Sequence, residues 1–301
     1  MNVFYSTDYA GSGYAFETTR KACWIADALN AEPISNLQLL APSPLTWEQL
    51  NLVHDEDYLR AVQTGLPIEL AQSQGFRWDA GLWPMVLASN GGMLAAALDA
   101  LRYGVAGSLS SGLHHARRGA GVGYCTFNGL VIAAQQVLNS GARSVLILDL
   151  DAHCGGGTAS LISEDSRLWQ LDISVDSYDC YDSSDRVRLQ MVSDSDSYLG
   201  EIETSLLALA RRGPKFDLCL YNAGMDPFQG SSDGGLVGIT REMLEAREKL
   251  VFEWCRQRQL PVAFALAGGY IGEHLDAPGL AALHRLTLSA AAQSQRLWQE
   301  E

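Results

Sequence analysis

The chain has 301 residues, of which 47% are hydrophobic and 19% charged, and 35 acidic against 21 basic side chains give a formal net charge of −14. This hydrophobic fraction excludes an intrinsically disordered chain. The acidic balance argues against nucleic acid as a partner, because phosphate contacts require a clustered basic surface. The length fits one large domain or two ordinary ones, and no linker-like segment or repeat divides the chain.

No apolar run approaches the roughly 18–20 residues that span a bilayer, and residues 1–17 lack the basic start and apolar stretch of a secretory signal. The six cysteines are dispersed without a Cys-x-x-Cys pair, which indicates reduced thiols rather than a disulfide framework. We therefore expect a cytoplasmic protein with no membrane partner.

Hydrophobic periodicity predicts helices over residues 17–31, 48–64, 88–103 and 129–139. Short apolar runs predict buried strands over residues 144–148, 169–175, 216–221 and 261–266. Apolar strands separated by helices indicate an α/β fold, with a parallel sheet covered on both faces. Ligands bind such sheets outside the carboxyl ends of the strands.

Chemically versatile residues follow the strand predicted over 144–148, in the segment DLDAHCGGGT. Alternation along the strand end places Asp149, Asp151 and His153 on one side. Carboxylate oxygen together with imidazole nitrogen suits zinc or a similar divalent metal. The alternative is that the two acids only cap the next helix. Asp226, in the segment NAGMDPF after another strand, supplies a third ligand or else a turn residue.

Two further segments carry candidate catalytic groups. His114 and His115 are adjacent in a glycine-rich loop, where they could deprotonate a water or serve a surface or core role. Tyr270, in the segment LAGGY, could donate a hydrogen bond to a developing oxyanion, although this pattern alone is weak.

Together these segments resemble the histone deacetylase superfamily, which includes acetylpolyamine amidohydrolases and bacterial relatives. The tandem histidines followed by GYCTFN, then DLDAHCGGGT, NAGMDPF and GGY, occur in the family's order. The resemblance implies a single domain over residues 1–301 with the arginase/deacetylase fold, a central mostly parallel sheet of about eight strands with helices on both faces. It further implies one Zn²⁺ per chain, held by Asp151, His153 and Asp226.

The remaining site residues are carried over by position. His114 and His115 resemble the catalytic histidine pair, Asp149 the carboxylate that orients His114, and Tyr270 the carbonyl-polarising tyrosine. Gly123 and Tyr124 match residues that line a narrow acyl-lysine channel. A structural K⁺ site is implied at the positions Asp149, Asp151, His153 and Ser174.

The chain also departs from the family pattern. Cys154 replaces a second histidine, and Gly156 replaces the polar partner of the second tandem histidine. We therefore expect His115 to lack a partner that orients it, with lower basicity and a looser tautomer. Gly155 stands where arginases carry a bridging acid, which favours one metal over two.

The resemblance implies a zinc-dependent amidohydrolase that removes acyl groups, acetyl above all, from an amine. Acyl-lysine on a peptide or protein is the first expectation, and a small acylated amine such as an acetylpolyamine is the alternative. A catalytically degenerate homologue that only binds a ligand is the alternative of another class.

Overall fold

The computed structural model of the protein describes residues 1–300. These residues form one eight-stranded sheet in the order β2-β1-β3-β8-β7-β4-β5-β6, in which all neighbouring strands are parallel. The strands are β1 (Asn2–Phe4), β2 (Gln38–Leu40), β3 (Val105–Ser108), β4 (Val145–Asp149), β5 (Leu168–Ser174), β6 (Val187–Met191), β7 (Leu218–Ala223) and β8 (Val262–Leu266). The predicted fold class is confirmed.

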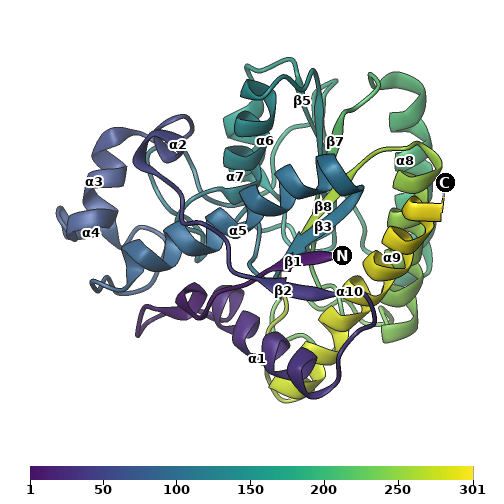
Figure 1. Cartoon of the computed structure of the whole chain (residues 1–301), viewed down its shortest axis with the longest axis horizontal. Coiled ribbons are helices and arrows are strands. Elements are labelled where there is room, and N and C mark those ends of the chain that lie inside the picture. Colours follow the sequence, from purple (N-terminus) through teal and green to yellow (C-terminus); the bar gives the residue numbers. More distant parts are fainter. Residues whose placement is uncertain (301) are drawn as a thin grey trace.

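Helices cover both faces of this sheet (Figure 1). One layer consists of α1 (Glu17–Ala31), α8 (Tyr198–Arg212), α9 (Arg241–Gln257) and α10 (Ala277–Glu300). The other consists of α2 (Trp47–Asn51), α3 (Glu56–Thr64), α5 (Leu82–Tyr103), α6 (Gly129–Asn139) and α7 (Gly156–Ile162), with α4 (Ile68–Ala71) packed on α3. Two 3₁₀ turns, η1 (Thr7–Ala10) and η2 (Ser195–Ser197), precede α1 and α8.

The central strand β4 shows why these strands are apolar throughout. Its five residues are all buried, and they alternate between the two layers. Leu146 and Leu148 face the core beneath α8, α9 and α10, whereas Val145 and Ile147 face the core beneath α5 and α6. Each side chain therefore has an apolar layer to enter, which is the arrangement expected of a parallel sheet covered on both faces.

Most predicted elements occur where the sequence indicates them, with two differences among the helices. The single helix predicted over residues 48–64 is wrong, because the chain breaks into α2 and α3 between Leu52 and Asp55. The helix predicted from residue 88 begins earlier, at Leu82. Pro84 is tolerated because it lies in the first turn, where a backbone N–H has no partner within the helix.

Helix α5 contradicts the expectation that no apolar run approaches the length that spans a bilayer. By length and composition alone it could cross a bilayer, but 67% of its most apolar window is buried inside the structure. Its apolar residues are accounted for by packing between β3, β8 and α6.

A buried arginine ties two strand ends together. Arg247, on α9, is fully buried and pairs with Glu248 at 2.6 Å. Its guanidinium also donates to Leu150 O, just beyond β4, at 3.2 Å and to Gly224 O, just beyond β7, at 2.7 Å. Because β4 and β7 are neighbours, this one side chain holds both chain segments in place as they leave the sheet.

We expect Arg247→Met to reduce the free energy of unfolding by about 3–5 kcal/mol, because it leaves Glu248 buried without its cation. Urea denaturation measures the change. Glu245→Gln, which removes an exposed pair with Lys249 on the same helix, is the matched control and should leave the midpoint unchanged. An equal effect of both substitutions would contradict the role given to Arg247.

Candidate active site

Three buried side chains meet beyond the carboxyl ends of β4 and β7. The ligand atoms that Asp151, His153 and Asp226 offer all lie within 4.8 Å of one another. His153 Nδ1 lies 3.2 Å from Asp151 Oδ1 and 3.1 Å from Asp226 Oδ2. The three predicted ligands therefore form one cluster, although residues 153 and 226 are far apart in the chain.

This cluster fits a tetrahedral divalent metal. With metal–ligand bonds of about 2.0–2.1 Å, neighbouring ligand atoms would stand roughly 3.3 Å apart, close to the observed spacings. One oxygen of each acid is already held by the backbone: Asp151 Oδ2 accepts from Gly268 N at 2.7 Å, and Asp226 Oδ1 accepts from Ala152 N at 2.9 Å. Burial and the Asp151 charge raise the pKa of Asp226, a repulsion that a cation would relieve.

The tandem histidines lie beside this cluster. His114 Nδ1 is 2.8 Å from Asp149 Oδ2, and because a carboxylate only accepts, Nδ1 carries the proton. Asn222 Nδ2 donates to the other oxygen of Asp149 at 2.8 Å. Burial alone would lower the pKa of His114, but the charges of Asp149 and Asp151 raise it to about 10. The structure thus places Asp149 where it orients His114.

The second histidine has a partner, so the expectation that it lacks one is wrong, although the expected lower basicity is found. His115 Nδ1 lies 2.9 Å from Asp179 Oδ2, which comes from the loop after β5, 64 residues along the chain. Burial and the neighbouring His114 lower the pKa of His115 to about 4, so its ring is neutral at pH 7. The two rings meet with their Nε2 atoms 3.1 Å apart. A neutral imidazole in this position can accept a proton.

Tyr270 follows β8. In the sequence it comes after the metal ligands, whereas the tandem histidines come before them, but its side chain lines the same cavity as His115. Its ring centroid is 6.0 Å from that of His153. Burial, together with the charges of Asp151 and Asp226, raises the pKa of Tyr270 well above its usual value. The phenol therefore keeps its proton and can donate a hydrogen bond.

A cavity of about 550 Å³ leads to these residues. Gly123 and Tyr124, the predicted channel residues, form part of its wall, and both have positive φ angles, 52° and 61°. Tyr178 forms another part, with its ring 5.0 Å from that of His115 and nearly perpendicular to it. The lining comprises Ser73, Gln74, Gly75, His115, Val122, Gly123, Tyr124, His153, Asp176, Tyr178, Asp233 and Tyr270.

Sequence reasoning missed Tyr178 and Asp179, and also Asp172, which is fully buried. Tyr178 and Asp179 follow β5, whose strand the sequence does predict, but the loop beyond that strand end has no recognisable pattern. Asp172 Oδ1 accepts from Ser174 Oγ at 2.5 Å. The K⁺ site implied at Asp149, Asp151, His153 and Ser174 stays a prediction, and this additional carboxylate lies beside it.

A buried basic residue also interacts electrostatically with two of the metal ligands. Lys21, on α1, is fully buried, and burial lowers its pKa to about 8 although Asp151 and Asp226 act in the opposite direction. The adjacent Arg20 is exposed.

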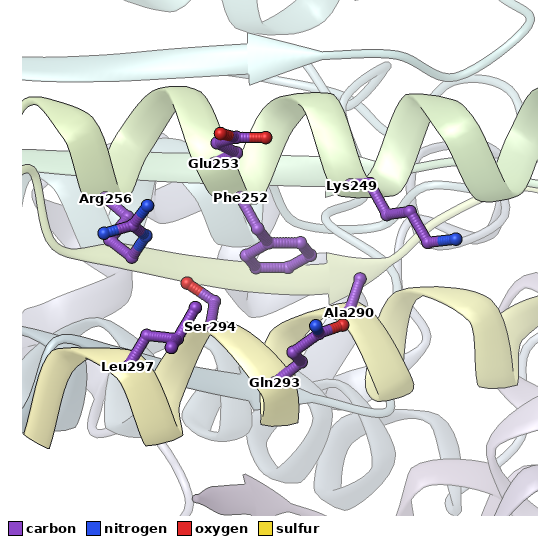
Figure 2. A pocket seen from close by; sticks show the side chains of 8 residues that line it. All are labelled: Lys249, Phe252, Glu253, Arg256, Ala290, Gln293, Ser294 and Leu297. Atoms are coloured by element: carbon purple, nitrogen blue, oxygen red, sulfur yellow. The ribbon is translucent and has the colours of Figure 1, made fainter. Parts of the chain in front are cut away.

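A second hollow, of about 270 Å³, lies between α9 and α10 and is separate from this site (Figure 2). Phe252 forms its floor between charged side chains such as Lys249 and Arg256. None of the residues that line it belongs to the catalytic or metal-ligating residues predicted from the sequence.

Comparison with known proteins identifies the family of this chain. Residues 15–285 match the histone deacetylase domain. An uncharacterized protein of Picosynechococcus is 34% identical over 226 residues, which are 73% of this chain and 75% of that protein. Histone deacetylase 2 of Arabidopsis thaliana is 28% identical over 245 residues, 76% of this chain and 62% of that protein. The acetoin utilization protein AcuC of Bacillus subtilis is 34% identical over 147 residues, 45% and 38% of the two chains.

Two solved structures share the fold. The HD domain of HDA15 superposes with a TM-score of 0.79 at 17% identity, covering 97% of this chain and 89% of that one. An acetylpolyamine aminohydrolase from Burkholderia pseudomallei superposes with a TM-score of 0.78 at 20% identity, covering 96% and 98%. The parallel sheet and the cluster beyond its carboxyl ends define an α/β protein of the arginase/deacetylase fold. The chain belongs to the histone deacetylase family, as the domain match over residues 15–285 shows.

We expect Asp226→Ala to abolish stoichiometric metal binding, because only an acid and an imidazole would then remain as ligands. Metal content per chain after dialysis, measured by elemental analysis, checks this. Asp233→Asn is the control: Asp233 Oδ1 lies 3.5 Å from His153 Nε2 but outside the three-ligand cluster, so its loss should leave the metal content unchanged. Full occupancy in Asp226→Ala would show that the third ligand is wrong.

Proposed function

We propose that this protein is a zinc-dependent amidohydrolase that removes an acyl group, acetyl above all, from the amine of acyl-lysine. The observation that carries the proposal is that one cavity is lined by His153 of the three-ligand cluster, by His115 of the carboxylate-linked histidine pair and by the protonated Tyr270. Family membership supports hydrolase chemistry, and the donor set of two acids and one imidazole supports zinc.

Each side chain has a defined part in this reaction. Zinc, when bound by Asp151, His153 and Asp226, supplies a Lewis acid that makes hydroxide available at neutral pH. His115, neutral at pH 7, accepts the proton of the attacking water and returns a proton to the leaving amine. His114 donates its Nδ1 proton to Asp149, and its Nε2 lies 3.1 Å from Nε2 of His115. Tyr270 donates to the oxygen on which negative charge develops.

Tyr270→Phe should retain the metal and the fold but lower kcat by about 10²–10³, since it removes one oxyanion donor. Steady-state hydrolysis of an acetyl-lysine peptide, with metal content measured in parallel, checks this. Phe16→Leu, which changes a ring 6.0 Å from Tyr270 without touching its hydroxyl, is the control and should lower kcat far less. Unchanged turnover in Tyr270→Phe would remove the tyrosine from the mechanism.

The charge of the cavity favours a cationic substrate. Asp176 and Asp233 both line it, and among the lining residues that the structure describes none is a lysine or an arginine. A substrate with a positive charge beyond the amide, in a basic peptide or in a polyamine, would therefore be attracted. This charge, and the fold shared with an acetylpolyamine aminohydrolase, support acetylpolyamine as the second candidate substrate.

Asp233→Asn should raise KM for acetylspermidine about two- to five-fold, a modest effect because the side chain is 64% exposed. The KM for an uncharged N-alkylacetamide should not change, and neither should any constant in Asp182→Asn, which removes an exposed acid outside this cavity. Equal increases for the charged and the neutral amide would contradict electrostatic selection.

The same assays separate an enzyme from a ligand-binding homologue. A panel of acetyl-lysine peptides and acetylpolyamines, tested with the zinc-loaded protein, should give turnover that Asp226→Ala abolishes. Zinc-loaded protein that turns over none of these amides would overturn the proposed function and favour the binding role.

A further inference from the structure

The loop after β5 provides an aspartate that is built into the site. Asp179 is 7% exposed, and its Oδ2 lies 2.9 Å from His115 Nδ1. The same oxygen accepts from the backbone N–H of Gly157 at 3.1 Å, and the other oxygen pairs with Arg117. Both carboxylate oxygens therefore have partners, which fixes the direction in which the acid faces His115.

The absence of a side chain at Gly156 makes room for Asp179. A Cβ atom at position 156 would lie 2.3 Å from the Asp179 carbonyl oxygen and 2.7 Å from its Oδ1. These distances are far below van der Waals contact, and the first involves backbone that cannot simply rotate away. A side chain at position 156 and the observed place of Asp179 exclude each other, so the glycine leaves the room that Asp179 occupies.

The backbone of the loop is adapted to this placement. Asp179 has a φ angle of 60°, in the left-handed region that few residues other than glycine, asparagine and aspartate adopt. The preceding carbonyl, that of Tyr178, accepts from Cys154 N at 3.0 Å and anchors the loop beside the metal-binding segment. Because aspartate is one of the few residues that adopt this conformation, the loop can hold a doubly paired acid at this position.

From this arrangement we infer that Asp179 is the positioning residue of His115, and that the polar partner missing at Gly156 is supplied instead by the loop after β5. The inference rests on the proposed function for the identity of the reaction, but its structural part does not. Because the carboxylate only accepts, it keeps the proton of His115 on Nδ1 and leaves Nε2, which faces His114 Nε2 at 3.1 Å, as the accepting atom of the ring.

Two substitutions at position 179 separate orientation from backbone strain. Asp179→Gly adopts the observed φ without cost but removes the acceptor, and it should lower kcat about 10- to 100-fold with KM within twofold. Asp179→Asn keeps an amide oxygen as acceptor and tolerates the same φ, so it should recover most of that loss. Asp182→Asn, an exposed acid on the same segment, is the matched control and should behave as the parent.

The effect of Asp179→Gly on KM distinguishes a role in positioning His115 from a purely structural role. If Asp179 only supported the wall formed by its neighbour Tyr178, Asp179→Gly would raise KM and spare kcat, and the inference would fail. It would also fail if Asp179→Asn were as impaired as Asp179→Gly, or if both retained the parental kcat.

A spectroscopic measurement tests the inference without any substrate. In the zinc-loaded protein labelled with ¹⁵N-histidine, with the signal assigned by its loss in His115→Gln, His115 should appear as the Nδ1–H tautomer. Asp179→Gly should convert it to a mixture, whereas Asp182→Asn should not. An unchanged tautomer in Asp179→Gly would overturn the inference even if the protein hydrolyses amides, and absence of hydrolysis in the parent would overturn only the proposed function.

Discussion

The whole site depends on holding several buried carboxylates together at the centre of a parallel sheet. Asp149, Asp151 and Asp226 are all almost completely buried, at the ends of two adjacent strands. Like charges so close would separate or become protonated without compensation. The compensation comes from the side chain of His114, from the backbone N–H groups of Gly268 and Ala152, and from the cation that the cluster fits.

The framework around these acids carries charge of its own. Within residues 1–300, Arg247 makes no hydrogen bond to the metal ligands or the tandem histidines. Its two carbonyl partners are close to them in the chain, because Leu150 immediately precedes Asp151 and Gly224 lies two residues before Asp226. A small movement of either segment would change the spacing between ligands that must agree within tenths of an ångström. The buried Arg247–Glu248 pair therefore links the packing of α9 to the geometry of the cluster.

The sequence predicts the metal ligands because each follows directly after an apolar strand that can be recognised on its own. In a parallel sheet the ends of such strands meet, so order along the chain is enough to bring Asp151, His153 and Asp226 together. The short outer strands β1 and β2, of three residues each, carry too little pattern to be found in this way. The break between α2 and α3 was missed because both halves share one hydrophobic spacing.

The partner of His115 could not be predicted for a different reason. A missing side chain at Gly156 is visible in the sequence, but the residue that takes its place is 23 positions further on, in a loop without a recognisable pattern. The structure shows that this loop comes so close to Gly156 that a side chain there would clash with it, and that Asp179 occupies the space. Loss of a residue from a motif is therefore weak grounds for inferring loss of its role.

Tyr178 and Asp179 are consecutive residues, one in the cavity wall and the other bonded to His115. If the protein acts on acylated amines as proposed, an acyl chain that displaced the tyrosine ring would also displace the adjoining carboxylate from the imidazole. Selectivity for chain length would then be expressed in turnover more than in affinity. Any attempt to widen this passage by redesigning Tyr178 would have to preserve the turn that follows it, or the altered enzyme would admit larger substrates and process none of them efficiently.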